Sequence, residues 1–119
     1  MNNIQDDPTT KILSRLLDAT AMRNKVLANN IANVDTPNFT RQDVPFEAEL
    51  ASAVRSGNVD GFAPKIETDK TTPARADGNN VAVDRELAEL NKNAMMHQMA
   101  IQLMQQKLSM QRIAITGHT

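Results

Sequence analysis

Apolar side chains recur at intervals of three and four residues over the last quarter of the chain, residues 84–115, which contain neither Gly nor Pro. This spacing is typical of a helix that packs lengthwise against another helix. The positions on this face are Leu87, Leu90, Ala94, His97, Ile101, Met104, Leu108, Gln111 and Ile115. A second stripe lies beside it and consists of Met96, Met99, Ala100, Leu103 and Met110. The apolar face is therefore wider than a two-stranded coiled coil requires, which indicates more than one helical neighbour.

Both ends of this expected helix carry signals. Asp84 is suited to cap its first turn, because an Asp side chain accepts hydrogen bonds from the free N–H groups there. Gly117 is suited to the left-handed turn that ends many helices, and Lys107 and Arg112 lie toward the negative end of the helix dipole. At about 1.5 Å per residue, a helix over 84–116 is a rod on the order of 48 Å long. A helix of that length needs a packing partner.

A second amphipathic pattern starts at Thr9 or Thr10, either of which can cap it, and predicts a helix over residues 9–35. The helix must end by residue 35, because Thr36 precedes Pro37 and is pushed toward extended backbone angles. Its stripe is narrower and consists of Leu13, Leu16, Leu17, Thr20, Leu27, Ile31 and Val34.

The segment between these helices, residues 36–83, is different in kind. Residues 39–44 alternate and predict a short strand or an extended arm, and residues 46–54 are sufficient for two helical turns. Residues 56–80 collect Gly, Pro and small polar side chains, which predicts loop. Residues 1–8 are polar, and we expect a disordered tip there.

The expected fold class is therefore mainly α. Long N- and C-terminal helices are predicted to pair as an antiparallel coiled-coil hairpin, with a polar, extended or partly disordered middle. Two helices that pack only on each other bury one stripe apiece, which barely offsets the entropy lost on ordering the chain. We therefore expect an unstable or partly unfolded monomer that becomes ordered when copies or relatives cover the remaining apolar faces.

The amino-acid composition argues against several classes of function for this protein. The net charge of −1 argues against a nucleic-acid partner, and the absence of Cys excludes disulfides and thiolate metal sites. No run of 18 apolar residues is present, so we expect no membrane span. The first residues lack the basic and apolar regions of a cleavable signal peptide. The protein is thus expected to stay in the cytosol or to leave it by a route that needs no such signal.

Candidate chemistry is sparse. His97 lies among several Met residues, and thioether and imidazole ligands suit Cu(I), but Met also fills helix–helix interfaces readily, and we favour packing. His97 at such an interface could weaken assembly at mildly acidic pH. No nucleophile–base pair stands out. Residues 77–84 superficially resemble a calcium-binding loop, but they lack the glycine at the sixth position and the acidic residue at the twelfth that such a loop requires. We expect no enzyme activity, no cofactor and no metal.

The unusual feature is residues 27–39, Leu-Ala-Asn-Asn-Ile-Ala-Asn-Val-Asp-Thr-Pro-Asn-Phe, which we call the signature segment. Three Asn within six residues are poor helix formers where a helix continues. Buried amides at a helix interface fix register, because a slip leaves them without partners. Simple fraying of the helix toward Pro37 explains the same residues equally well, and both interpretations stay open.

The signature segment resembles the N-terminal signature shared by bacterial flagellar axial proteins of the rod, hook and hook-associated class. Within that class, residues 41–46 (Arg-Gln-Asp-Val-Pro-Phe) and residues 78–94, which begin Gly-Asn-Asn-Val-Ala-Val-Asp-Arg-Glu, resemble the proximal component of the basal-body rod. Asn38 stands where this family usually has Gly, a replacement that is tolerable because Asn also adopts left-handed angles. The resemblance covers both ends of the chain and leaves residues 51–76 unmatched.

The resemblance implies a structural subunit of the flagellar basal-body rod. Such subunits are exported unfolded through the flagellar type III apparatus without a cleaved signal, and they form a tubular periplasmic rod that transmits motor torque. Their terminal helices pack as coiled coils in a helical, non-closing arrangement. The implied partners are other copies of the chain, other rod subunits, the rod–ring adaptor and the export apparatus.

Two sets of residues follow as hypotheses. The assembly seam, which we expect to carry contacts between subunits, consists of Leu13, Leu16, Leu27, Ile31, Leu87, Leu90, Ile101, Met104 and Leu108. The register and turn motif consists of Ala28, Asn29, Asn30, Ile31, Ala32, Asn33, Asp35, Thr36, Pro37 and Phe39. The alternatives are another flagellar rod component, or a cytosolic helical adaptor or chaperone that binds partner helices on its Met-rich face.

Overall fold

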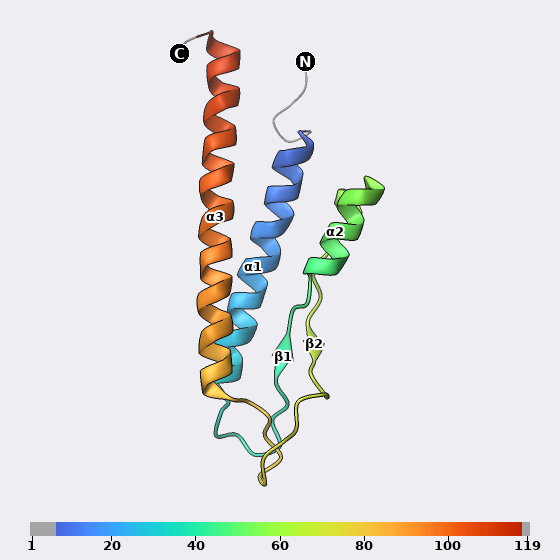
Figure 1. Cartoon of the computed structure of the whole chain (residues 1–119), viewed down its shortest axis with the longest axis vertical. Helices are drawn as coiled ribbons and strands as arrows, with labels where there is room; N and C mark the ends of the chain where they lie inside the picture. The colour runs from blue at the N-terminus through green and yellow to red at the C-terminus, as the bar shows by residue number, and fades with distance from the viewer. Residues whose placement is uncertain (1–6, 118–119) are drawn as a thin grey trace.

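The computed structural model describes residues 7–117 and forms an elongated molecule, with extents of 64 × 28 × 15 Å. In chain order, its elements are α1 (Pro8–Ala32), β1 (Gln42–Asp43), α2 (Glu47–Ser56), the 3-10 turn η2 (Val59–Gly61), β2 (Glu67–Thr68) and α3 (Val83–Thr116). Helices α1 and α3 run antiparallel and pack along each other, and α1 lies between α3 and α2 (Figure 1). This confirms the predicted mainly helical hairpin. The expected disordered tip lies outside the described residues, apart from its last two positions.

The start of α1 differs from the prediction. The carboxylate of Asp7 accepts a hydrogen bond from the backbone N–H of Thr10 at 3.1 Å, so Asp7 is the cap and neither Thr9 nor Thr10 serves as one. Pro8 occupies the first helical position, where its missing N–H costs nothing and its fixed φ suits the helix. The helix ends at Ala32, a little earlier than expected.

One end of α3 is as predicted and the other is not. Gly117 ends the helix with a φ of 72°, in the left-handed region, as expected. At the other end the residue in the capping position is Ala82, which has no side-chain acceptor, so the prediction that Asp84 caps the helix is wrong. Asp84 instead lies within the first turn, where a negative charge still interacts favourably with the helix dipole.

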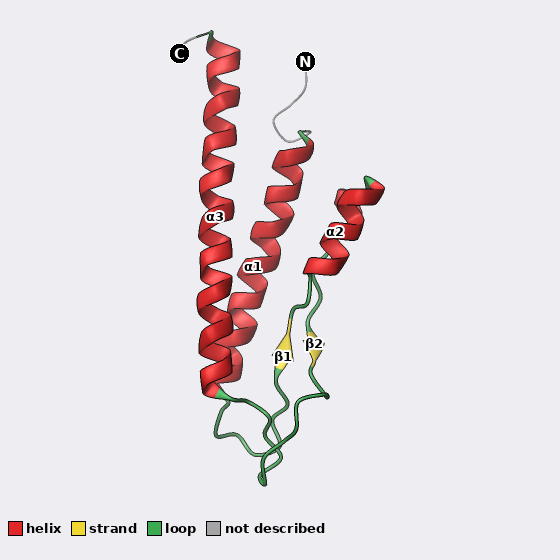
Figure 2. Cartoon of the chain, viewed as in Figure 1, coloured by secondary structure: helices red, strands yellow, loops and turns green. Residues whose placement is uncertain are grey.

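The middle of the chain is mostly loop, with one short helix and a two-residue strand pair (Figure 2). Strands β1 and β2 pair antiparallel, with Gln42 opposite Thr68. Helix α2 is held on α1 by the guanidinium of Arg23, which donates to the Glu47 carboxylate at 2.6 and 2.7 Å and lies 4.3 Å from the centre of the Phe46 ring. The small core beneath it contains Ala19, Val26, Val44, Phe46, Leu50 and Phe62.

A buried ionic network joins the loop end of the hairpin. Arg41 and Glu86 are both almost completely removed from water, and the Arg41 guanidinium donates to the Glu86 carboxylate at 2.6 Å. The same guanidinium donates to Asp69 at 2.8 Å. The buried amide of Asn30 donates to Glu86 at 3.0 Å and also bonds both backbone groups of Gln42. One network therefore connects α1, the β1 strand, the loop after β2 and the start of α3.

Removing Glu86 is expected to destabilise the fold strongly. In Glu86→Ala the Arg41 charge stays buried with only Asp69 beside it, and the free energy of unfolding should fall by about 3 kcal/mol. Urea unfolding followed by circular dichroism measures this loss. Glu89→Ala, three residues further along α3 and outside the network, is the matched control and should change stability by less than about 0.5 kcal/mol. Equal losses in both variants would show that the network does not stabilise the fold.

Stability is also expected to fall in acid because of Asp69. Hydrogen bonds from the hydroxyls of Thr71 and Thr72, both at 2.7 Å, and then from the Arg41 guanidinium hold the pKa of Asp69 far below its ordinary value of 3.8. The unfolded chain therefore takes up a proton before the folded chain does. This stabilisation is present in full above the unfolded value and is lost as the pH falls through 3.8 and below.

Asp69→Asn tests this pH dependence. The variant should be less stable than the parent at pH 7, and its unfolding midpoint in urea should decline less steeply between pH 5 and pH 3, because the titrating group is gone. An acid decline as steep as that of the parent would assign the effect to other carboxylates.

Candidate assembly surface

The residues of the predicted assembly seam fall into three classes of burial. Leu13 and Leu27 are buried between the elements, whereas Leu87 keeps 45% of its surface exposed. The half-buried members are Leu16, Ile31, Leu90, Ile101, Met104 and Leu108. Part of the seam is thus used within one chain, and its proposed role between chains stays a prediction.

The buried line of α3 lies one residue away from the expected one. Its fully buried positions are Glu86, Asn93 and Ala100, spaced seven residues apart, while the expected line ran through Leu87 and the positions seven apart from it. A pattern search for apolar residues passes over Glu86 and Asn93 because both are polar. Their heptad spacing with Ala100 is the signal that could have found them.

A polar cluster, which we call the polar rung, crosses the middle of the α1–α3 interface. The Oγ1 atom of the buried Thr20 lies 2.6 Å from Nδ1 of His97, and the Asn93 amide donates to the Thr20 carbonyl at 2.8 Å. His97 is half-buried at this interface, on the line where the sequence places it. Because hydrogen bonds are directional, sliding α3 along α1 would break all of these contacts. The rung fixes the axial register of the two long helices.

The signature segment divides between the interior and the surface. Asn30 is completely buried in the ionic network, whereas the Asn33 amide donates locally to the Asn29 carbonyl at 2.8 Å and its Oδ1 accepts from Thr36 at 3.1 Å. Asn38 has a φ of 62°, which is the left-handed geometry expected of it. Of the remaining motif residues, those exposed to solvent are Ala28, Ala32, Asp35, Thr36 and Pro37, and Phe39 is half-buried.

A side chain from the distant loop holds the turn after α1. The fully buried Asn79 directs its Nδ2 group toward the carbonyls of Asn33, Val34 and Thr36 at 2.8, 3.1 and 2.9 Å. Carbonyl groups at the C-terminal end of a helix have no hydrogen-bond donor within the helix, and the Asn79 amide donates to the carbonyls there. The sequence indicated only a loop around Asn79, because capping by a residue so far along the chain has no local signature.

Several exposed apolar side chains of α3 form a line that we call the outer stripe. Its members keep between 43% and 72% of their surfaces exposed and are Met95, Met99, Leu103, Met110 and Ile113. At about 100° per residue, Met95 lies half a turn from the buried Glu86, on the side of α3 turned away from α1. The second stripe expected from sequence contains three of these residues, while its Met96 packs on the α2 core and its Ala100 is buried.

Helix α3 also extends beyond α1. The Lys107 ammonium lies 3.4 Å from the carboxylate of Asp7, the residue that caps α1, and α3 continues from there to Thr116 (Figure 1). The outer stripe runs into this extension, because Met110 and Ile113 lie beyond the ion pair. An extended apolar line on a protruding helix is a suitable contact for another helix.

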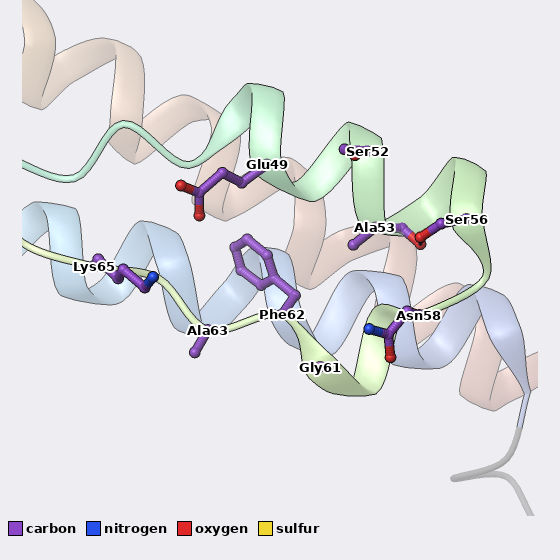
Figure 3. Close-up of a pocket in the computed structure, with 9 residues that line it drawn as sticks. All are labelled: Glu49, Ser52, Ala53, Ser56, Asn58, Gly61, Phe62, Ala63 and Lys65. Atoms are coloured by element: carbon purple, nitrogen blue, oxygen red, sulfur yellow. The ribbon is translucent and has the colours of Figure 1, made fainter.

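Two of the hollows in the described surface lie next to the long helices and α2. One, of about 280 Å³, lies between α2 and the segment after η2, with Phe62 at its base and Glu49 and Lys65 toward one end (Figure 3). Its lining includes two Ser but no His or Cys that could activate them. The other, of about 400 Å³, lies beside the polar rung between α1 and α3. Neither arrangement forms a catalytic group.

Within residues 7–117, no three His, Cys, Asp or Glu side chains lie close enough together to hold a metal ion. None of the helices described there combines the length and the apolar character that crossing a bilayer requires.

Comparison with known proteins assigns the family. A family model described as flagella basal body rod protein matches residues 17–40, which include the signature segment. The flagellar basal body rod protein FlgB of Borrelia hermsii is 38% identical over 104 residues, covering 70% of this chain and 77% of that protein. FlgB of Bacillus subtilis is 31% identical over 122 residues, covering 92% and 94%, and FlgB of Salmonella typhimurium is 28% identical, covering 86% and 88%. With both long helices and the signature turn in place, the chain belongs to the FlgB family of flagellar basal body rod proteins.

Proposed function

We propose that the protein is a structural subunit of the proximal rod, in which copies of the chain and other rod subunits join through their terminal helices into a helical tube. The observation that carries this proposal is the outer stripe. One side of α3 is occupied by α1, while Met95 and Met99 lie on the opposite side and Leu103 lies on the flank between, all three exposed to solvent within about two turns. Apolar lines of this kind on a soluble helix mark contact surfaces.

Burial of the outer stripe supplies the driving force for assembly. Covering a large apolar side chain completely is worth about 1.5–3 kcal/mol, and the five side chains of the stripe are only partly covered within the chain. If the outer stripe of one subunit packs against a different face of the next subunit, the contact is head-to-tail. Such contacts do not close into a dimer and so extend into a tube.

The contacts within the chain are suited to a subunit that transmits mechanical force. The polar rung and the ionic network oppose sliding of α3 along α1, so force applied to the protruding end of α3 is passed to the whole hairpin. We infer that this is how a subunit takes part in the transmission of torque from the motor toward the hook.

Membership of the family supports a proposal about export and location. The chain is proposed to pass unfolded through the flagellar type III apparatus, to need no cleavable signal, and to reach the periplasmic rod beside the rod–ring adaptor. A thin hairpin with polar groups at its main interface is expected to unfold at modest cost, which suits this route. Because its relatives are rod proteins, the rod is favoured over a cytosolic adaptor or chaperone.

Placing a charge in the outer stripe should abolish assembly. Leu103→Asp is tolerated in the free chain, because Leu103 is 46% exposed, but in the assembly it buries a carboxylate without a partner. Swimming of a strain that lacks its own copy of the gene should be restored by the parent and not by this variant. The amount of rod-incorporated protein in isolated basal bodies should fall at least tenfold.

Gln105→Asp is the matched control, since it introduces the same charge two residues later, at an exposed position on nearly the opposite side of α3. It should restore swimming, and both variants should keep the helical content of the parent by circular dichroism. Normal swimming with Leu103→Asp would remove the outer stripe from the assembly surface.

A further inference from the structure

The hollow beside the polar rung, of about 400 Å³, lies between α1 and α3 and has room for a whole side chain. Four residues of each helix line it, and among them are Ala21 and Ala94, whose side chains are small and exposed. A water molecule takes up only about 30 Å³ of the liquid, so the space is much larger than one water requires. We call this hollow the socket.

The wall of the socket contains a buried acceptor that has no donor. Asn93 lines the socket, keeps 2% of its surface exposed, and donates from Nδ2 to the Thr20 carbonyl at 2.8 Å. Reversing the amide would place its oxygen against that carbonyl, so Oδ1 is the atom left over. Within residues 7–117, Oδ1 of Asn93 has no hydrogen-bond partner. A buried acceptor without a partner is unfavourable, and a donor that enters the socket removes this cost.

We propose that the socket receives the carboxamide side chain of an Asn or Gln from a neighbouring rod subunit, and that the N–H of this side chain donates to Oδ1 of Asn93. This inference rests on the proposed function and specifies the chemistry of one contact between subunits. Asn93 then selects the partner, because a side chain without a donor leaves its oxygen unpaired.

The groups that line the socket distinguish a carboxamide from other side chains. The ammonium of Lys25 lines the socket and repels an entering Lys or Arg. An ionised Asp or Glu has acceptors only, and an apolar side chain has no polar group, so neither offers a donor to Asn93. A carboxamide is neutral, its N–H suits Oδ1, and its carbonyl is able to accept a hydrogen bond from Lys25. Since Lys25 is on α1 and Asn93 is on α3, the two ends of an amide are suited to bridge the walls, whereas a hydroxyl has one oxygen for both.

The socket lies on a different flank of α3 from Leu103, so the two contacts can be tested separately. At about 100° per residue, Ala94 lies roughly 100° to one side of Asn93, and Leu103 lies roughly 80° to the other side. Lys25 and Gln98 line the socket with long, exposed side chains that can move aside as a partner enters.

Filling the socket should block assembly. Ala94→Leu places a branched side chain in the hollow, at an exposed position where the hairpin itself tolerates it. In a strain that lacks its own copy of the gene, the variant should accumulate to the parent's level in an immunoblot of whole cells. Its amount in isolated basal bodies should fall at least tenfold, and swimming should stop. Ala94→Ser keeps the socket open and should match the parent in all three measurements.

Second-site revertants identify the side chain that enters the socket. Swimming cells are selected from the Ala94→Leu strain, and the genes of all rod subunits are sequenced. We expect the compensating changes to convert an Asn or Gln of a rod subunit to Ala, Ser or Gly, because a smaller side chain fits beside the introduced leucine. Changing that Asn or Gln to Leu in the parent strain should stop swimming, because Oδ1 of Asn93 then stays unpaired.

Ala94→Leu that assembles as well as the parent would overturn the inference, and so would an equal loss with Ala94→Ser. Compensating changes confined to charged, hydroxyl or apolar side chains, or a complete lack of second-site revertants, would contradict a carboxamide partner. If Leu103→Asp blocks assembly while Ala94→Leu does not, the socket fails and the proposed function stands. If neither change matters, both the socket and the proposed use of α3 in assembly are contradicted.

Discussion

The buried ion pair between the Arg41 guanidinium and the Glu86 carboxylate fixes how the segments of this chain are arranged. Arg41 and Glu86 compensate each other, and Asn30 fills a remaining bonding site of the carboxylate. Since the three residues come from the position just before β1, from α3 and from α1, none of these segments can shift without leaving a charge unpaired in the interior. The long helices are thus fixed to each other at the loop end of the hairpin.

Both sides of α3 mix polar and apolar side chains. The side against α1 carries Asn93 and His97, whose bonds to Thr20 are directional, and the side facing solvent carries the outer stripe. Directional contacts specify one register within the chain. Apolar contacts tolerate a range of approach angles, because they depend on area more than on orientation. The chain therefore combines a defined register between its long helices with an exposed apolar surface that accepts a range of approach angles.

Periodicity alone was enough to predict both long helices and the short α2, since each depends on residues close in sequence. The caps were predicted less well, because Asp7, Thr9 and Thr10 all have side-chain oxygens that can accept a hydrogen bond and only the backbone geometry selects among them. The buried line of α3 was missed by one position. Counting apolar residues favours Leu87 over Glu86, whose burial depends on an Arg 45 residues away. Long-range pairing of polar groups has no local signal, and it decides which face of the helix turns inward.

The amide of Asn79 has a consequence for the exposed turn that follows α1. It occupies the peptide carbonyls of residues 33, 34 and 36, while the side chains of Asp35 and Pro37 remain in contact with solvent. A molecule that approaches this tip therefore finds the carbonyls of residues 33, 34 and 36 already bonded, which disfavours main-chain pairing through them. Recognition at this end of the molecule is thus expected to depend on the side chains of the turn.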